Sequence, residues 1–145
     1  MTAKIQAGTL TMSSTERVEL VDLTERVMQA VAARGVRESL VNVCSLHTPA
    51  ALFVARPDRT LLPALRRALE GSPSSEGFLW RADETPGSAG PPDAAAHLEV
   101  PMLGHSLTLQ ISEGELVLGA WQRPLLAELD GPRARQLRVQ VWGGA

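Results

Sequence analysis

The chain has 145 residues, of which 44% are hydrophobic, and this size and composition predict one domain with a packed core of its own. Its formal net charge of −2 argues against a protein that binds nucleic acid by electrostatic attraction, and the single cysteine, Cys44, excludes an internal disulfide. The sequence has no long apolar run and no signal-peptide core, so we expect a cytoplasmic protein that does not enter membranes.

The first part of the chain predicts strands followed by a helix. Residues 9–23 mix short alternation with polar positions, which favours one or two edge strands. Asp22 with Glu25 three positions later is typical of a capping box, in which the carboxylate accepts backbone N–H groups at a helix start. Apolar residues at four-residue spacing then predict a helix of about three turns that lies on a sheet and ends at Gly35.

The next part predicts a buried strand with a histidine at its end. Residues 36–46 leave neither face of an extended segment polar, which is typical of a strand covered on both sides. Pro49 restricts Thr48 to an extended conformation and removes a ladder donor, so His47 and Thr48 are expected at a strand edge or bend. Residues 51–55 continue as a second strand.

A second helix and a long irregular segment follow. Thr60 is the expected N-cap of a helix over residues 61–70, and Pro63 is tolerated in its first turn, where N–H groups have no intrahelical partner. Residues 72–92 are rich in glycine, proline and serine, which predicts a flexible loop. Within it, Phe78-Leu79-Trp80 is expected to anchor the loop to the body of the protein or to a neighbouring subunit.

The last third of the chain predicts mostly strands. Asp93 can cap a short helix over residues 94–98, and Glu113-Gly114 is typical of a hairpin turn. The expected strands cover residues 107–111, 116–121, 125–129 and 137–142. We expect this half to be an antiparallel meander. The whole chain is therefore expected to have an α+β fold, an antiparallel β-sandwich or meander with two helices packed on it.

Three histidines are candidates for chemistry. A lone histidine at a strand end, such as His47, is by position alone more often structural than catalytic. His47 and His97 together are the kind of neutral imidazoles that bind a divalent metal such as zinc, although two ligands alone do not define a site. His105, which lies beside Ser106, fits a cleft wall or a turn.

Unusual residue choices gather in the C-terminal third. Trp121-Gln122 fits a core aromatic beside an edge polar residue, or a stacking surface and a two-way hydrogen-bonding amide for a heteroaromatic ring. Glu128 and Asp130 flank the expected turn, where they either stabilise it or bind a metal or a protonated heterocycle. Arg133 and Arg135 fit a basic edge strand or a bidentate site for phosphate or diphosphate.

These motifs resemble one known family. The closing segment, with Trp121-Gln122, an apolar run, Glu-x-Asp-x-Pro-Arg up to Arg133 and a second arginine two positions on, resembles that of the YjbQ family. His47-Thr48-Pro49-Ala50-Ala51 resembles the family's His-Thr-Thr-Ala-Ala. With His97-Leu98-Glu99 and Leu103-Gly104-His105-Ser106 also matching, the resemblance covers nearly the whole chain.

The resemblance implies a function and a site. It implies a YjbQ-like fold, a homotrimer with clefts near subunit boundaries, and a weak thiamine-phosphate synthase activity. That reaction joins a pyrimidine methyl diphosphate to a thiazole phosphate and releases diphosphate, so the expected partner is a small phosphorylated heterocycle or anion. The implied catalytic residues are His47, His97 and Glu128, with a divalent metal, Mg or Zn, on the two histidines. The implied substrate-binding residues are Thr48, His105, Ser106, Trp121, Gln122, Asp130, Arg133 and Arg135.

Several positions depart from the family pattern. Ala55-Arg56 stands where the family usually carries Asn-Glu, and Ala95 stands where it has Asp or His. Glu99 replaces a basic residue. Because reactive groups are lost while the C-terminal motif remains, the alternative hypothesis is a catalytically impaired member. Such a protein would act as a small-molecule or anion-binding protein, or as a structural trimer.

Overall fold

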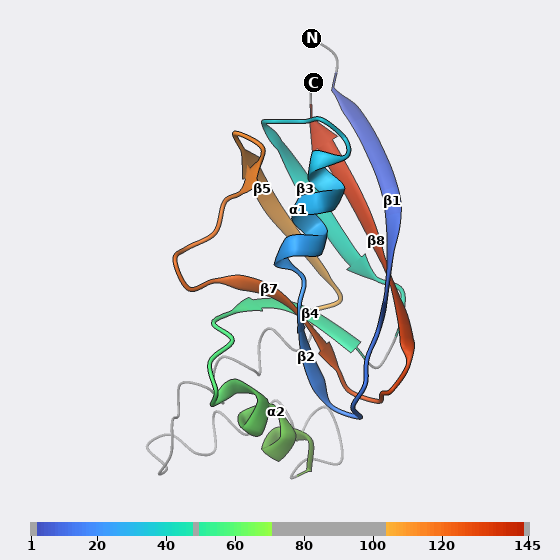
Figure 1. Cartoon of the computed structure of the whole chain (residues 1–145), viewed down its shortest axis with the longest axis vertical. Helices are drawn as coiled ribbons and strands as arrows, with labels where there is room; N and C mark the ends of the chain where they lie inside the picture. The colour runs from blue at the N-terminus through green and yellow to red at the C-terminus, as the bar shows by residue number, and fades with distance from the viewer. Residues whose placement is uncertain (1–2, 48–49, 71–103, 144–145) are drawn as a thin grey trace.

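The computed structural model describes residues 3–47, 50–70 and 104–143. The expected loop at 72–92, its aromatic anchor and the helix at 94–98 lie outside these residues. The described part contains eight strands and two helices (Figure 1). They are β1 (Lys4–Ser13), β2 (Glu19–Asp22), α1 (Thr24–Ala32), β3 (Ser39–Ser45), β4 (Ala50–Ala55), α2 (Leu61–Glu70), β5 (Ser106–Ser112), β6 (Glu115–Leu116), β7 (Arg123–Glu128) and β8 (Ala134–Gly143).

The strands form two antiparallel sheets. The larger has the order β1-β8-β3-β5-β6, and the smaller has the order β2-β7-β4. Helix α1 lies across one face of the larger sheet, and α2 lies against the smaller one (Figure 1). The α+β class, with antiparallel sheets and two packed helices, is therefore confirmed. The segment predicted as one or two edge strands forms two, because β1 and β2 are each the edge of a sheet.

Each helix buries one apolar stripe in its own core cluster, and the cluster of α1 also includes Leu126 of β7. Val27 and Val31 of α1 are buried in one cluster with Val41, Val139 and Val141 of the larger sheet. A second cluster joins the buried stripe of α2 to the smaller sheet, and its members include Leu61, Leu65, Phe53 and Leu125. Full burial of such a side chain contributes about 1.5–3 kcal/mol, so these two clusters hold the helices in place.

Both helix starts use the same aspartate and threonine arrangement, which corrects the expected caps. At α1, Asp22 Oδ1 accepts hydrogen bonds from the backbone N–H (2.9 Å) and hydroxyl (2.6 Å) of Thr24, with no side-chain cap bond at Leu23. At α2, Asp58 Oδ1 accepts the same two bonds from Thr60, also at 2.9 and 2.6 Å. The bonds from Thr60 lower the pKa of Asp58. The Thr60 hydroxyl is therefore a donor to Asp58 and does not accept a helix N–H.

The second half of the chain forms one hairpin and then divides between the sheets. β5 and β6 form the expected hairpin, with Glu113 at φ 54° and Gly114 at φ 83° in the turn. β6 ends at Leu116, so the strand expected through Trp121 is shorter than predicted. β7 pairs with β2 and β4, while β8 pairs with β1 and β3. The prediction of an antiparallel meander is wrong at this point, because β7 and β8 follow each other in sequence but lie in different sheets.

No helix in the described ranges is long and apolar enough to cross a membrane.

Candidate functional site

Three strands of the larger sheet continue into strands of the smaller sheet at one corner of the molecule. Ser13 of β1 lies opposite Ala134 of β8, and after the connections Glu19 of β2 and Ala50 of β4 both lie opposite Glu128 of β7. The pairing of β3 with β8 extends beyond the strand, because the Leu46 N–H donates to the Gln136 carbonyl (3.2 Å). We define the crossover corner as residues 14–18, 46–47 and 129–133 together with Glu128 and Arg135. Such switches between packed sheets are where irregular backbone gathers.

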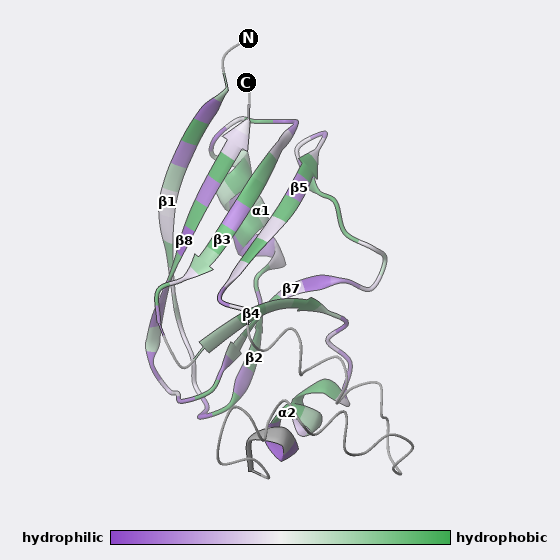
Figure 2. Cartoon of the chain, turned by 180° about the vertical axis from the view of Figure 1, so that it is seen from behind, coloured by the Kyte–Doolittle hydropathy of each residue, from purple (hydrophilic) through white to green (hydrophobic). Residues whose placement is uncertain are grey.

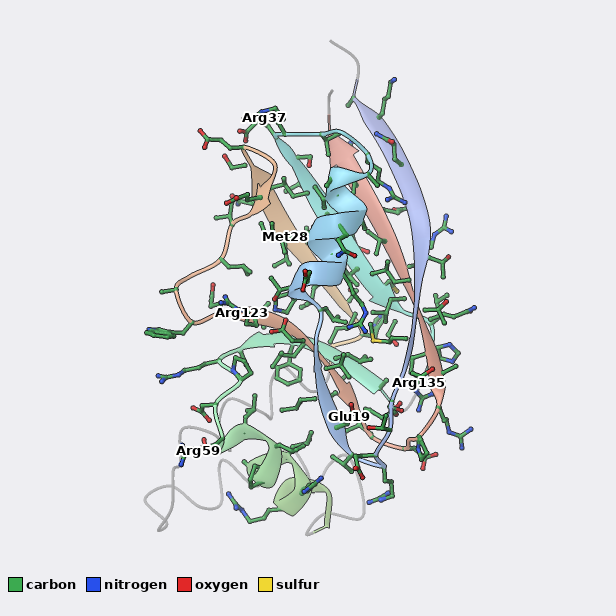
Figure 3. The ribbon with its side chains drawn as sticks, in the orientation of Figure 1. Glu19, Met28, Arg37, Arg59, Arg123 and Arg135 are labelled. Carbon is green, nitrogen blue, oxygen red and sulfur yellow. The ribbon has the colours of Figure 1, made fainter. Side chains whose placement is uncertain are left out.

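A buried ion pair holds this corner together. The Arg135 guanidinium donates to Glu128 through two bonds, Nε to Oε1 at 2.8 Å and Nη2 to Oε2 at 2.6 Å. Glu128 is 0% exposed and Arg135 is 3% exposed. Glu128 ends β7 and Arg135 lies at the start of β8, so the pair ties the two sheets together across the connection between these strands. Figure 3 shows Arg135 at this corner.

Further donors complete the environment of the buried carboxylate. The Ser14 hydroxyl donates to Glu128 Oε1 (2.7 Å), and the backbone N–H groups of Leu129 and Asp130 donate to Oε2, each at 3.1 Å. Ser14 Oγ also accepts the Arg133 N–H (2.9 Å). Both carboxylate oxygens are therefore occupied by donors from three segments of the corner.

These bonds set the charge state of the pair. Burial alone would raise the pKa of Glu128, but the hydrogen bonds from Arg135, Ser14 and the Asp130 backbone outweigh it and lower that pKa to about 2. The same contact with Glu128 raises the pKa of Arg135. The two groups are ionised together and neutralise each other, which gives them a structural role in the fold. The catalytic role of Glu128 and the anion-binding role of Arg135 stay predictions.

The turn after Glu128 is packed so closely that only glycine fits. A Cβ at Gly131 would meet the Glu16 carbonyl oxygen, Ser14 Oγ at 2.5 Å and Glu128 Cγ at 2.9 Å. The Gly131 N–H donates to the Arg17 carbonyl (2.9 Å), and the peptide bond to Pro132 is cis. The Asp-Gly-Pro-Arg motif therefore packs the connection between β7 and β8 against the connection between β1 and β2.

His47 lies half-buried at the end of β3, as expected from the sequence. Its backbone is fixed by Ser45, whose hydroxyl donates to the His47 carbonyl (3.1 Å) and accepts the His47 N–H (3.3 Å). Its Nε2 atom is buried and has no hydrogen-bond partner among the described residues. Buried polar atoms without a partner are rare, so this atom is a candidate contact for a ligand.

His105 and Ser106 approach the same corner from β5. The Ser45 N–H donates to the His105 carbonyl (2.8 Å), which places His105 beside the end of β3. Both His105 and Ser106 are exposed. Thr48 and His97, also expected in the site, lie outside the described residues. The metal expected on His47 and His97 stays a prediction, since the described part of the chain holds no group of three potential ligands.

Arg133 and Asp130 form the outer surface of the corner. The Arg133 side chain is 59% exposed and the Asp130 side chain 47% exposed. Arg133 Nε donates to the Asp130 carbonyl (3.0 Å), and its Nη2 donates to Asp130 Oδ2 (3.3 Å). Within the described ranges, Nη1 of Arg133 has no protein acceptor. Arg133 is thus oriented by Asp130 and still presents part of its guanidinium to solvent.

Trp121 and Gln122 lie away from this corner. They precede Arg123, which begins β7, whereas Glu128 ends it. Five steps of about 3.3 Å along a strand separate the two positions by roughly 17 Å, and Figure 3 shows Arg123 and Arg135 on opposite sides of the molecule. Trp121 is 68% exposed and stacks on Arg56, whose guanidinium carbon is 5.0 Å from the ring centroid. The expected stacking residue and the expected anion-binding arginines therefore do not meet within one chain.

The Gln122 amide is engaged in its own turn. Its Oε1 accepts the Gly119 N–H (2.8 Å), which leaves the amide nitrogen for other contacts. Two residues in these regions were not predicted as functional. Ser14 lies in a run of hydroxyl residues without a motif, and Arg56 was noted only as a departure from the family pattern.

Known proteins similar to this chain share its fold and length. A UPF0047 protein of Methanothermobacter thermautotrophicus is 35% identical over 135 residues, which cover 92% of this chain and 90% of that protein. One from Archaeoglobus fulgidus is 35% identical over 134 residues, covering 91% and 98%. The crystal structure of a YbjQ-like protein of unknown function from Sulfolobus solfataricus superposes with a TM-score of 0.73 at 29% identity, covering 99% of this chain and 100% of that one. The sequence pattern of the UPF0047 protein YjbQ-like family matches residues 8–144, and the chain belongs to this family.

Proposed function

We propose that the crossover corner binds a small phosphorylated heterocycle or anion, and that His47 and Arg133 contact it. The observation that carries the proposal is the buried Nε2 atom of His47, which lacks a partner within the described ranges. An unsatisfied buried polar group costs about 1–3 kcal/mol. A ligand oxygen that accepts a hydrogen bond from this imidazole N–H recovers that cost, and this favours a ligand with several oxygens.

One exposed arginine of the corner is placed to bind an anion. Arg135 is neutralised by Glu128, so it adds no net charge to the corner surface. Arg133 is the arginine of the motif that stays exposed, and Asp130 orients its planar guanidinium. A guanidinium held in this way suits the paired oxygens of a phosphate or diphosphate. Arg133 would therefore supply most of the electrostatic attraction, and a hydrogen bond from His47 would fix the orientation of the bound anion.

The enzymatic form of this proposal is the thiamine-phosphate synthase reaction. In that reaction a thiazole nitrogen forms a bond to the pyrimidine methylene carbon while the bond from that carbon to the diphosphate oxygen breaks. Arg133 would stabilise the leaving diphosphate, and His47 would hold or move a proton at Nε2. The described geometry supports binding more directly than turnover, because Glu128 and Arg135 bind each other and Trp121 lies at the other end of β7.

A homotrimer is part of the proposal. Within one chain roughly 17 Å of strand separates Trp121 from the corner. A neighbouring copy could place its own Trp121 beside this corner, where the ring would stack on the heterocycle of a bound ligand. In this arrangement the site is complete only in the assembly.

Calorimetric titration with inorganic diphosphate tests the binding proposal. We expect saturable binding that Arg133→Ala and His47→Gln each weaken by about tenfold or more, equivalent to about 1.4 kcal/mol. Arg26→Ala is the matched control, since it removes an exposed arginine of α1, outside the corner and outside the loop that carries Trp121, and it should change affinity less than about twofold. Failure to bind diphosphate at millimolar concentration, or equal losses in all three variants, would contradict the proposal.

A turnover assay tests the enzymatic form separately. Purified protein is incubated with the pyrimidine diphosphate and the thiazole phosphate, with and without added Mg²⁺ or Zn²⁺, and thiamine phosphate is detected by mass. Product that is lost in Arg133→Ala would assign the reaction to this corner. If diphosphate binds but no product forms with any metal, the protein is a binding protein and the synthase form of the proposal is wrong.

A further inference from the structure

One end of the smaller sheet carries an exposed aromatic ring among positive and hydrogen-bond-donating groups. Ala55, the last residue of β4, lies opposite Arg123, the first residue of β7, so the neighbouring Arg56 and Trp121 lie at the same end of the sheet. Figure 2 shows hydrophilic residues both where β7 begins and along the connection from β4 to α2. We call Arg56, Trp121, Gln122 and Arg123 the tryptophan surface.

Arg56 covers only part of the Trp121 ring. Its guanidinium carbon lies 5.0 Å from the ring centroid, within the range of a cation–π contact. Trp121 is nevertheless 68% exposed, so much of its ring surface is open to solvent. A planar ligand ring that stacks on the open part of Trp121 therefore lies close to the positive charge of Arg56.

The positive charges of the tryptophan surface are available to a ligand. Within the described ranges, neither Arg56 nor Arg123 forms an ion pair with a carboxylate. Arg123 Nη1 donates to the Gln122 carbonyl (2.8 Å), which holds this second cation beside the loop. Asp58, two residues after Arg56, offsets part of the charge, although its Oδ1 is directed to Thr60 and accepts two hydrogen bonds there.

The Gln122 amide is oriented as a donor. Because its Oε1 accepts the Gly119 N–H (2.8 Å), its two N–H groups remain for a ligand. A ring atom with a lone pair can accept from them, whereas a ring nitrogen that is protonated or alkylated cannot. The amide therefore favours the same kind of ring as the two arginines, one that is rich in electrons and carries acceptor atoms.

We propose that Arg56 determines which ring binds on Trp121, and that it selects a neutral or anionic heteroaromatic ring over a cationic one. A cationic ring is repelled by Arg56 and competes with it for the electrons of the indole, whereas an anionic ring is attracted. This role of Arg56 rests on the proposed function, because the ring is the heterocycle of the same phosphorylated ligand.

The charge of the ring distinguishes the two substrates of the synthase form. When the thiazole nitrogen bonds to the methylene carbon, the electron pair of the broken bond leaves with the diphosphate. The thiazole then becomes a positively charged thiazolium, while the pyrimidine stays neutral and keeps its ring acceptors. Trp121 with Arg56 is therefore a surface for the pyrimidine and disfavours the thiazolium of the product.

Titration of the full chain with one ring in three charge states tests the proposal. Nicotinate is an anion, nicotinamide is neutral, and ring-methylated nicotinamide is a cation whose ring nitrogen has no lone pair. The chain has three tryptophans, and the indole N–H signal of Trp121 in a ¹H–¹⁵N spectrum, assigned with Trp121→Phe, reports binding. We expect saturable shifts at millimolar concentration, with nicotinate bound about fivefold more tightly than the cation.

Three variants separate selection by charge from a structural role of Arg56. Arg56→Gln should reduce the preference for the anion to less than about twofold, and Arg56→Lys, which keeps the charge, should preserve it. Arg26→Gln, at an exposed position of α1, is the matched control and should also preserve it. A structural role alone would leave the ratio of the two affinities unchanged. Far-UV circular dichroism confirms that each variant is folded.

The outcome is distinguishable from that of the diphosphate titration. Equal affinity for anion and cation, a preference that survives Arg56→Gln, or no shift of Trp121 with any of the three compounds would overturn the role of Arg56. If diphosphate still binds at the crossover corner, the binding proposal stands without it. Selection by charge at Trp121 without diphosphate binding would support the role of Arg56 and contradict the site at the corner.

Discussion

Replacement of Glu128 by glutamine should strongly destabilise the fold at neutral pH. The variant keeps the shape of the side chain but leaves the buried guanidinium of Arg135, which is 3% exposed, without a counter-charge. Removal of one partner from a buried ion pair costs about 3–5 kcal/mol. We expect that loss in the free energy of unfolding at pH 7, measured by urea denaturation followed by circular dichroism. Glu115→Gln, at an exposed position of β6, should change it by less than about 0.5 kcal/mol.

The effect should also depend on pH in a defined direction. The pKa of Glu128 is lowered from 4.5 to about 2, so its ionised form stabilises the fold above pH 4.5, and this contribution is lost as the pH falls toward 2. A difference of 2.5 pKa units, at about 1.36 kcal/mol each, amounts to about 3 kcal/mol, of which about 2 kcal/mol is lost by pH 3. The Gln variant lacks this titration.

The quantity to test is therefore the difference in the free energy of unfolding between the unmodified protein and the Glu128→Gln variant. It should shrink by about 2 kcal/mol between pH 7 and pH 3, because the unmodified protein loses the contribution of Glu128 and the variant has none to lose. Other carboxylates titrate equally in both proteins and cancel. A difference that stays constant with pH, or a cost below about 1 kcal/mol at pH 7, would refute the assignment of the ion pair.

Two further variants probe the packing of the crossover corner. Gly131→Ala should lower the free energy of unfolding by about 1–3 kcal/mol, because its Cβ would press on the Glu16 carbonyl and Ser14 Oγ. Gly119→Ala should lower it much less, because its new Cβ would meet a flexible glutamine side chain at 3.1 Å. Thermal unfolding measures both effects. Ser14→Ala removes the 2.7 Å bond to the buried carboxylate and should cost about 1.5–3 kcal/mol in urea unfolding, against little change for the exposed neighbour in Ser13→Ala. Equal effects within either pair would contradict the packing described here.

Local patterns predicted most of the elements of the fold. The four-residue spacing of apolar side chains indicated α1, the expected start at Thr60 indicated α2, and Gly35, at φ 67°, lies in the left-handed conformation expected after α1. The order of the strands was beyond such patterns. β7 and β8 are separated by one turn in sequence, and only their pairing partners, β2 with β4 and β1 with β3, place them in different sheets. The helix starts were also misread, since Asp22 acts on Thr24 and not through a capping box.

The positions of His47 and of the Asp-Gly-Pro-Arg turn could be predicted from the sequence, whereas the contacts of Glu128 and Arg135 could not. His47 was expected at a strand end and is found there, and the Asp-Gly-Pro-Arg motif was expected to turn the chain, which it does at the corner. The sequence contains no signal that Glu128 and Arg135 bind each other, because their contact depends on a strand that leaves one sheet and enters another. Nor does it indicate that the length of β7 separates Trp121 from Arg133.

The binding proposal depends on the His47 imidazole, whose Nε2 has no hydrogen-bond partner among the described residues, and nuclear magnetic resonance can observe this atom directly. The three histidines of the chain would be resolved in a ¹H–¹⁵N spectrum of the side chains, assigned with His47→Gln and His105→Gln. On titration with inorganic diphosphate, we expect the Nε2 signal of His47 to shift saturably and Arg133→Ala to suppress the shift. A His47 signal that stays unmoved while diphosphate binds elsewhere, or that shifts equally in Arg133→Ala, would contradict the proposed contact.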